Sequence, residues 1–480
     1  MKGKIIILLS FVALFGCDAY LDETPDNRQT VTTLEDVSEL LVSAYSNASY
    51  NYIEWKTDNS VEIKDNTQYD WMTENFSYLP VVSEESQDTP TYLWNENYAA
   101  ISHANQALEE LGNIEITDID HANALRGEAL MARAYNHFIL ASVFCLNYNE
   151  TNKTALGLPY ITAPETQLKV DYDRGTLEET YNLIEKDLLE AISLISNDYY
   201  NGTGKYHFNK NAALAVASRF YLFKQDYEKS IEYADQIVGA SASTTAYVRN
   251  YTDVYTGSAT ERALNFIDVD LASNLLVVRK ESVYDRVTRG YRLGIPLFFS
   301  IFRDDIIQSG SDRRLSGYTQ GTSAVLLPKY NELFQYETAT TGNPYLIVPE
   351  LRSEEVLLNR IESFAHLNQL DKALEYYNAL AAYWYTSGGQ LTQPEITAFF
   401  GGTDQEAMIK FITAERRKEF LYEGLRWFDI KRLGLEINHV ISTDTNGDVI
   451  EEVTLTSDDL RKAEQIPAAA ISNGIEANPR

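Results

Sequence analysis

The stretch LRGEALMARAYNHFILASVFCL, Leu125 to Leu146, decides the fold class of this 480-residue chain. Its residues Leu130, Ala134, Phe138 and Ala141 are three or four positions apart, a spacing that places them on one face of an α-helix. The pattern therefore predicts a helix here. Cys145 lies within the same apolar run and is expected to be a buried free thiol.

Further helical patterns lie on both sides of this stretch. A helix is predicted over about Trp94–Leu111, and Gly112 with Asn113 supplies its stop signal. Strand-like alternation is short and scattered, so the chain is predicted to be mainly α. The other predicted helix pairs are Leu177–Ile195 leading to Asn211–Val238, and Glu350–Leu367 leading to Asp371–Tyr385.

Two of these helix pairs share a repeat spacing. Tyr221 precedes Ser230 by nine residues, and Phe364 precedes Ala373 by nine, which is tetratricopeptide (TPR) spacing. The small residue at the second position lets two helices approach closely. Because Ser230 and Ala373 lie 143 residues apart, the repeats cannot form an uninterrupted array, and we expect long loop insertions within one compact body.

The composition excludes several classes of protein. With 44% hydrophobic and 23% charged residues, the chain is too apolar to be largely disordered. A formal net charge of −30 argues against a nucleic-acid partner. The 33 Tyr and 5 Trp side chains each combine an apolar face with a polar tip, which suits a hydrated binding surface.

The N-terminus has the design of an export signal. Lys2 and Lys4 precede a run of twelve small or apolar residues, Ile5 to Gly16, which is too short to span a membrane. The following Leu14-Phe15-Gly16-Cys17 resembles a bacterial lipobox, although Phe15 departs from the usual small residue. We expect residues 1–16 to be a lipoprotein signal peptide and 17–24 a tether acylated at Cys17; an ordinary secretory signal is the alternative.

Searches for catalytic, metal and nucleotide motifs are mostly negative. The six histidines are not at metal-ligand spacing, and Gly202–Lys205 lacks the remainder of a P-loop. Asn446-Gly447 lies between Val440-Ile441 and Val449–Leu455, and this arrangement is typical of a β-hairpin turn. The sequence therefore predicts no metal site, no cofactor and no catalytic residue.

The segment ITAERRKEFLYEGLRWFDIKRLG, Ile412 to Gly434, is the most specific string in the chain and resembles the C-terminal signature of the SusD/RagB family. Shorter matches occur in family order from Trp94 to Pro479, so the resemblance covers nearly the whole chain. The signature positions that match are Glu415, Arg416, Glu419, Glu423, Gly424, Arg426, Trp427, Asp429, Arg432 and Gly434.

The resemblance implies a SusD-like fold: a TPR-like scaffold of helix pairs with long loop insertions and a few short strands. It also implies three parts of the mature chain. These are an N-terminal part over 25–240 with helix pairs near 94–146 and 177–240, a decorated central insertion over 241–349, and a C-terminal part over 350–480 with a signature helix at 412–434.

The signature segment also invites a comparison with glycosidases, which use paired carboxylates. Glu415, Glu419 and Glu423 share one helix face, however, and cannot flank a sugar from two sides. Glu423–Arg426 and Asp429–Arg432 have the spacing of helix ion pairs. We therefore expect a structural network here, with Trp427 packing beside it.

Candidate ligand-binding residues come from two polar, aromatic-rich regions, because sugars stack on flat rings and bond to nearby amides, carboxylates and guanidinium groups. In the family, ligand aromatics tend to come from these two regions. The alternative is that the aromatics pack beneath their loops. The candidates are Asp58, Asn59, Tyr69, Asp70, Trp71 and Tyr78 in the early region, and Arg279, Tyr284, Tyr291 and Arg292 in the central insertion.

The function implied by the resemblance is capture of an oligo- or polysaccharide at the cell surface. The protein would be lipid-anchored to the outer membrane, facing the exterior, and would deliver its ligand to a SusC-like TonB-dependent transporter. A RagB-type peptide-binding lipoprotein is the alternative within the family. A surface glycosidase and a general TPR interaction protein are the rivals from other classes.

Overall fold

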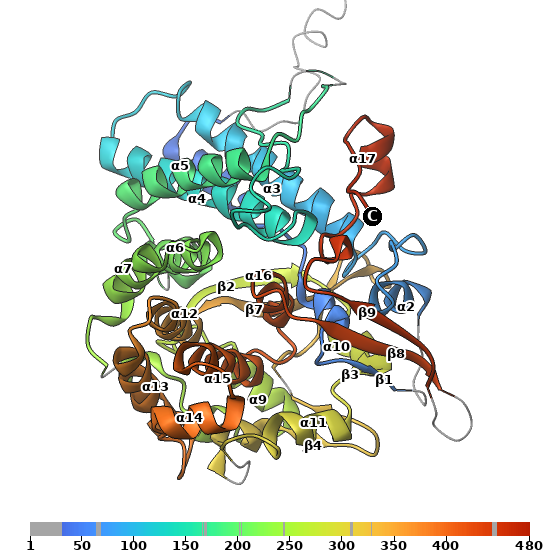
Figure 1. Ribbon diagram of the computed structural model, residues 1–480. Coiled ribbons are helices and arrows are strands. Elements are labelled where there is room, and N and C mark those ends of the chain that lie inside the picture. Colours follow the sequence, from blue (N-terminus) through green and yellow to red (C-terminus); the bar gives the residue numbers. More distant parts are fainter. Residues whose placement is uncertain are drawn as a thin grey trace, which may run out of the picture.

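The computed structural model describes residues 31–480 except 64–68, 166, 168–169, 201, 203, 243–244, 308–310, 328 and 444–448. The predicted signal peptide, tether and lipidated Cys17 lie outside these residues. Helices dominate, as predicted, and the strands are few and mostly short. Figure 1 shows α3 to α7 and α12 to α15 stacked along one side of the molecule, with β1, β3, β8 and β9 on the other.

The first three long helices lie where the sequence predicts them. They are α3 (Pro90–Glu110), α4 (Ile119–Phe144) and α5 (Leu177–Leu194). Local sequence fixes their starts, because the Thr89 side chain accepts a hydrogen bond from Tyr92 N, and Thr176 forms a capping box with Glu179. Cys145, just after α4, is buried and unpaired.

The predicted helix Asn211–Val238 is wrong in one respect, because it is two helices. These are α6 (Lys210–Lys224) and α7 (Tyr227–Val238). Gln225 ends α6 in the left-handed conformation with φ 66°, and the Asp226 side chain then caps α7. Because the chain turns at Gln225, α6 and α7 form a tetratricopeptide-like hairpin in which the small Ser230 of α7 faces α6.

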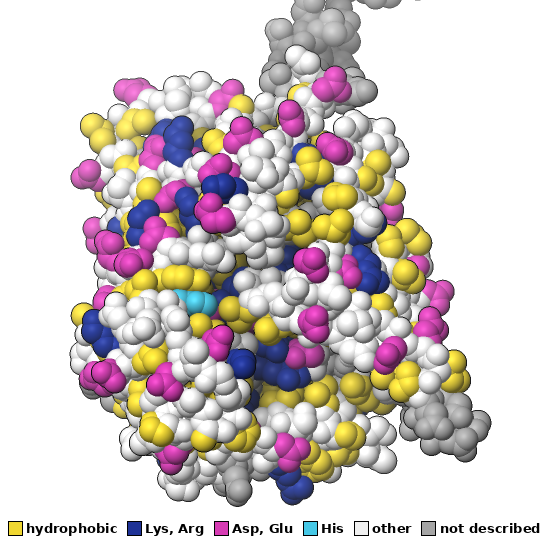
Figure 2. Space-filling view, in the orientation of Figure 1, with side chains coloured by type: hydrophobic (Ala, Val, Ile, Leu, Met, Phe, Trp, Pro, Cys, Tyr) yellow, Lys and Arg dark blue, Asp and Glu magenta, His cyan; other side chains and the backbone are white. Residues whose placement is uncertain are grey.

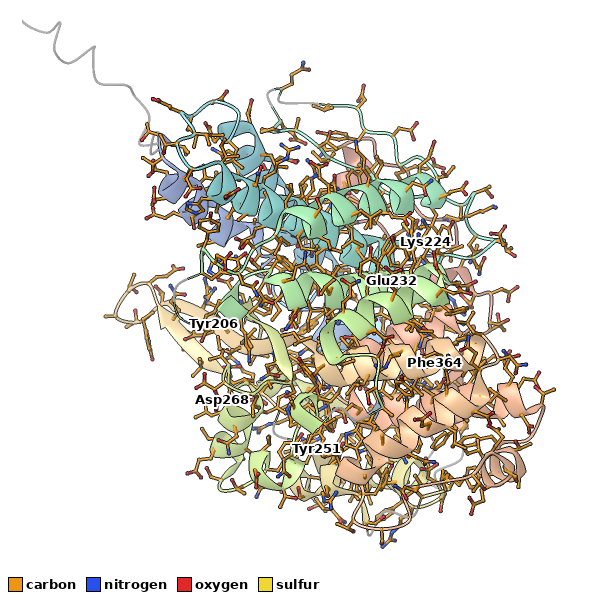
Figure 3. The ribbon with its side chains drawn as sticks, turned by 90° about the vertical axis from the view of Figure 1, so that its left-hand side faces the viewer. Tyr206, Lys224, Glu232, Tyr251, Asp268 and Phe364 are labelled. Atoms are coloured by element: carbon orange, nitrogen blue, oxygen red, sulfur yellow. The ribbon has the colours of Figure 1, made fainter. Side chains whose placement is uncertain are left out.

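The second hairpin consists of α12 (Ser353–His366) and α13 (Leu370–Trp384), and α12 packs against α7. Figure 3 shows Glu232 of α7 and Phe364 of α12 on neighbouring helices, although the two hairpins are far apart in the sequence. The predicted start at Glu350 is wrong, because that residue belongs to the strand that precedes α12.

The C-terminal part continues with α14 (Gln393–Phe400), α15 (Asp404–Glu419) and α16 (Leu425–Arg432). The predicted single helix over 412–434 is therefore also two helices. Gly424, at φ 75°, is the left-handed residue that immediately precedes α16.

The sheets come from segments before, between and after the helix pairs. β2 (Asn274–Glu281), β7 (Gly342–Arg352) and β6 (Leu333–Tyr336) form an antiparallel sheet in the order β2-β7-β6. β8 (Ile437–Thr443) and β9 (Val449–Leu455) pair antiparallel, which confirms the predicted hairpin strands, while the predicted turn lies outside the described residues. The remaining strands form two small pairs: β1 (Val61–Glu62) with β3 (Tyr291–Arg292), and β4 (Thr319–Gln320) with β5 (Val325–Leu326).

Short helices complete the fold and carry its surface segments. They are α1 (Leu34–Leu41), α2 (Asp70–Phe76), α8 (Tyr251–Val254), α9 (Ala259–Phe266), α10 (Tyr284–Val287), α11 (Ile295–Phe302) and α17 (Ala468–Ser472). None of the helices in the described part of the chain is long and apolar enough to cross a membrane.

One hydrophobic core runs through the molecule. Its buried members extend from Leu34 near the start of the described chain to Ile466 near its end. The division into 25–240, 241–349 and 350–480 therefore does not correspond to separate cores, and as a division of the sequence it stays a prediction.

Candidate functional site

The signature carboxylates face arginines that come from distant parts of the chain. Arg352 lies 2.9 Å from Glu419 and 2.9 Å from Glu423, and Arg314 lies 3.1 Å from Glu415. All five side chains are buried. Each carboxylate is held by a guanidinium group and has no open side on which a sugar could lie.

A second part of the network joins α15, α16 and α12. Asp429 accepts hydrogen bonds from Arg432 at 2.7 Å and from Arg416 at 3.1 Å, so the predicted Asp429–Arg432 pair is confirmed. Arg432 also pairs with Glu362 of α12. Burial alone would raise the pKa of Glu362, but Arg432, His366 and Arg416 together hold it well below its usual range. The network therefore fixes α16 against the helix pairs.

The predicted Glu423–Arg426 pair is wrong, because each residue has another partner. Arg426 donates to both carboxylate oxygens of Asp58 at 2.8 Å, while Glu423 pairs with Arg352 and Lys329. Asp58 was a candidate for ligand binding. Burial would raise its pKa, but Arg417 and Arg426 lower that pKa well below its usual range.

Asn59 and Glu54 also hold the early loop against the signature segment. Asn59, the second candidate in that loop, is buried; it donates to Glu54 at 2.9 Å and accepts from Arg417 at 2.7 Å. Glu54 also accepts from the backbone N–H of Gly424 at 3.1 Å. Asp58 and Asn59 therefore join the early loop to α15 and α16. Trp427 is fully buried nearby, beneath the Lys56 ammonium group.

The structure brings the two predicted ligand regions together. β1 from the early region pairs with β3 from the central insertion, with Val61 opposite Arg292. Thr73 Oγ1 lies 2.8 Å from the Tyr291 hydroxyl, and the rings of Phe76 and Tyr291 are 4.6 Å apart. Residues separated by more than 200 positions thus build one local surface.

Most of the predicted aromatics lie beneath that surface and not on it. Trp71, Tyr78, Tyr284 and Tyr291 are all buried. Trp55 links two of them, since its ring centroid is 5.1 Å from that of Trp71 and 5.5 Å from that of Tyr284. This stack forms a rigid base for the residues above it.

Apart from Asp58, whose carboxylate is held by Arg417 and Arg426, four candidates remain at least partly accessible, and three of them lie on this side of the molecule. The Tyr69 side chain is 45% exposed, and its ring lies 6.3 Å from that of Trp71, at the start of α2. Asp70 follows it and is exposed, while Arg292 is half-buried. We call Val61, Glu62, Tyr69, Asp70 and Arg292 the β1–β3 surface.

Arg279, the fourth accessible candidate, lies elsewhere, on β2. Its guanidinium group stacks over the Tyr345 ring at 4.7 Å and donates to Gln335 at 2.7 Å. The structure does not bring it to the β1–β3 surface through any described contact.

Helix α11 adds aromatic side chains that sequence reasoning missed. Gly294, which precedes it, packs so closely on Val61 that a Cβ would lie 2.7 Å from Val61 Cγ2. Phe298 and Phe299 are half-buried on this helix, and Figure 2 shows hydrophobic side chains gathered over it. The signal in the sequence was the run IPLFFSIF, Ile295–Phe302.

The described residues contain no group of three or more His, Cys, Asp or Glu side chains that could hold a metal ion. The arrangement consists of an exposed ring over an aromatic base, a guanidinium group, and the Glu62 and Asp70 carboxylates. Such groups can stack on and hydrogen-bond to a polar ligand.

Comparisons with known proteins agree with this architecture. A family model described as "Starch-binding associating with outer membrane" matches residues 19–222, and the model described as "SusD family" matches residues 308–470. SusD-like proteins P38 and P2 of Formosa agariphila are 22% and 23% identical to this chain. The alignment with P38 covers 89% of this chain and 90% of P38, and the alignment with P2 covers 71% of each.

Solved structures share the fold at low sequence identity. A SusD-like carbohydrate binding protein from Bacteroides vulgatus superposes with a TM-score of 0.67 at 18% identity, over 92% of this chain and 97% of that one. A SusD superfamily protein from Bacteroides fragilis gives a TM-score of 0.69 at 18% identity over the same shares.

Proposed function

Since the chain belongs to the SusD family, whose members are non-catalytic binding proteins, we propose that it captures an oligo- or polysaccharide on the β1–β3 surface. The observation that carries this proposal is the convergence of two distant, aromatic-rich segments at the β1–β3 pair. Loops held on a rigid base are suited to binding, because little conformational freedom is lost when the ligand arrives.

The chemistry of the surface suits a sugar. The exposed Tyr69 ring offers a flat apolar face to the C–H side of a pyranose. Arg292 is half-buried and supplies guanidinium donors, although its Nε atom is itself buried and has no hydrogen-bond partner among the described residues. Glu62 and Asp70 supply acceptors for hydroxyl groups. Each contact is weak, so we propose that affinity comes from several sugars of one chain binding together.

The test compares the full-length protein, in mild detergent, with its Tyr69→Ala variant on a panel of immobilised polysaccharides and peptides. We expect one glycan class to be retained without released product, and Tyr69→Ala to reduce retention at least tenfold. Tyr336→Ala is the matched control, because Tyr336 is 69% exposed on β6, away from this surface. Trp71 is unsuitable for truncation, because its burial against Trp55 makes loss of folding the expected result.

The outcomes separate the alternatives. Equal retention by wild type and Tyr69→Ala would refute the placement of the site. Retention of peptides alone would make the protein a RagB-type peptide binder. Release of product would contradict a purely binding role.

We further propose that the protein is an outer-membrane lipoprotein acylated at Cys17 that passes its ligand to a SusC-like TonB-dependent transporter. The family model named for outer-membrane association and the lipobox-like Leu14–Cys17 support this. Purification from outer membranes in mild detergent should recover a large β-barrel with the wild type. A Cys17→Ser variant should fail to fractionate with the membrane. Recovery of the wild type alone at native expression would contradict the partnership.

A further inference from the structure

A cavity with a volume of about 480 Å³ lies between helix α3 and the sheet strand β2. That volume falls within the roughly 300–1,000 Å³ of typical small-molecule sites. Its walls come from four places in the chain: the 3-10 helix η1 (Val42–Ala44) and the residues that follow it, α3, the end of the 3-10 helix η3 (Gly204–Tyr206), and β2. We call it the α3–β2 cavity, and none of its lining residues belongs to the β1–β3 surface.

Small side chains on α3 create the space. Ala99 and Ala100 face the cavity from α3, and Val277 and Val278 line it from β2. At the rim the Tyr206 side chain is 53% exposed, so its ring is accessible to a ligand in the cavity. Figure 3 shows Tyr206 at the edge of the molecule, beside the strands of the sheet.

The polar groups of the cavity come from opposite walls. Glu96 of α3 accepts a hydrogen bond from Asn47 Nδ2 at 3.2 Å and has no ion-pair partner among the described residues. On β2, Arg279 lies 3.3 Å from Glu281, so its charge is largely balanced. A ligand would therefore meet the Glu96 carboxylate, which has no ion pair among the described residues, and the Arg279 guanidinium group, whose charge Glu281 already balances.

Two histidines also line the cavity but do not neutralise Glu96. Burial lowers the pKa of His103, which is therefore neutral at pH 7. His207 Nδ1 lies 2.8 Å from a carboxylate oxygen of Glu128, and this hydrogen bond raises the pKa of His207. His207 therefore pairs with the deeper Glu128 and not with Glu96. Glu96 also interacts with the buried Lys280 ammonium group, so the charges around the cavity largely offset one another, which favours a neutral ligand.

We propose that the α3–β2 cavity is a second ligand site and that it takes a short, neutral oligosaccharide. An exposed tyrosine ring offers a stacking face, Glu96 accepts from sugar hydroxyls, and Arg279 donates to them. Small apolar residues at the floor leave room for the ring itself. The inference does not rest on the β1–β3 surface, because it uses different residues and different elements.

The experiment measures stoichiometry with the full-length protein in mild detergent. The probes are labelled tri- to hexasaccharides prepared from neutral glucans, xylan, mannan and galactan, with trilysine as the cationic comparison. Ala99→Trp fills the cavity from an exposed helix position, and Glu109→Trp is the matched control, exposed on the same helix outside the cavity. Tyr206→Ala gives a second variant, at a side chain that is 53% exposed.

We expect wild type and Glu109→Trp to bind two oligosaccharides per chain. Ala99→Trp and Tyr206→Ala should each leave one, and combining Ala99→Trp with Tyr69→Ala should leave none. If neither Ala99→Trp nor Tyr206→Ala changes the stoichiometry, the second site is refuted and the β1–β3 proposal is not. If these two variants lose one bound oligosaccharide and Tyr69→Ala loses none, the β1–β3 proposal is refuted and the second site is not. Absence of any saccharide binding would overturn both. Binding of trilysine alone in the cavity would overturn the ligand class.

Discussion

Gly424 is a position of the signature segment at which the local geometry requires glycine. Its φ of 75° is in the left-handed region, and a Cβ there would lie 2.8 Å from the carbonyl oxygen of Tyr50. Its N–H also donates to the buried Glu54. Glycine is needed both for the backbone conformation and for the close approach of a second segment.

The Gly424→Ala substitution should therefore destabilise the protein by about 2–4 kcal/mol, because left-handed strain and steric overlap add together. Gly434→Ala is the control, since Gly434 has φ 61° and the nearest atom to its Cβ position is Ser457 Cβ at 3.7 Å, an ordinary van der Waals contact; it should lose only about 1–2 kcal/mol. Urea unfolding followed by circular dichroism measures both values. Equal losses would show that the approach of Tyr50 contributes nothing.

Asp88 is a buried carboxyl group that connects two parts of the chain. It accepts hydrogen bonds from Ser282 Oγ at 2.8 Å and from Val283 N at 2.7 Å. Burial raises the pKa of Asp88 to about 7 despite these hydrogen bonds. Because the folded state holds this proton more tightly than the unfolded state, the group makes folding less favourable as pH rises.

We expect the Asp88→Asn variant to gain stability relative to wild type as pH rises from about 4 to about 7, and the difference to be constant above that range. A pKa of about 7 against the ordinary 3.8 corresponds to at most roughly 4 kcal/mol. Urea unfolding at a series of pH values measures the difference. A difference that shrinks with rising pH would mean that the pKa of Asp88 is lowered, not raised.

At the scale of elements, the α6–α7 hairpin depends on a small residue at its closest point. Ser230 and Ser218 are fully buried, and each hydroxyl donates to the backbone carbonyl of the other, at 2.9 and 3.2 Å. Ala373 is equally buried in the second hairpin. Close packing, and not the serine hydroxyl, is the shared property of the two positions.

Ser230→Ala should therefore change stability by no more than about 1 kcal/mol. Ser230→Leu should cost about 1–3 kcal/mol, because added methylene groups force the two helices apart. The two variants are compared by urea unfolding under the same conditions. If Ala proved as damaging as Leu, the hydrogen bonds and not the packing would govern this contact.

At the scale of the whole molecule, contacts between distant segments join the first and last of its three sequence parts. Lys56 lies 2.6 Å from Glu464, and both side chains are buried. Near the C-terminus, Asn478 accepts from Arg174 at 2.8 Å and donates to the Phe144 carbonyl at 2.7 Å. The C-terminal segment is thus held against the N-terminal half of the chain.

Because one core and these contacts span the chain, we expect a single cooperative unfolding transition. Differential scanning calorimetry should give one peak whose calorimetric and van't Hoff enthalpies agree. Two resolved peaks would instead indicate that 25–240 and the rest of the chain unfold independently.

Much of the fold could be predicted from local pattern. The long helices α3, α4 and α5, the hairpin strands β8 and β9, and the Asp429–Arg432 pair depend on residues close in sequence, whose spacing the chain shows directly. The helix break at Gln225 was missed, because a single left-handed residue leaves the apolar period intact on both sides. The break over 420–424 was also missed, although two of its residues, Tyr422 and Gly424, have positive φ.

The candidate site was less predictable, because burial is decided by distant neighbours. The sequence by itself determined the helix pairs, the family signature and the two regions rich in aromatics. Only the tertiary structure decided that Trp71 and Tyr284 lie beneath the surface while Tyr69 stays exposed, and that Arg426 pairs with Asp58 and not with Glu423. The physical reason is that both outcomes depend on which side chains from elsewhere in the chain arrive at the same place, and helical spacing carries no information about that.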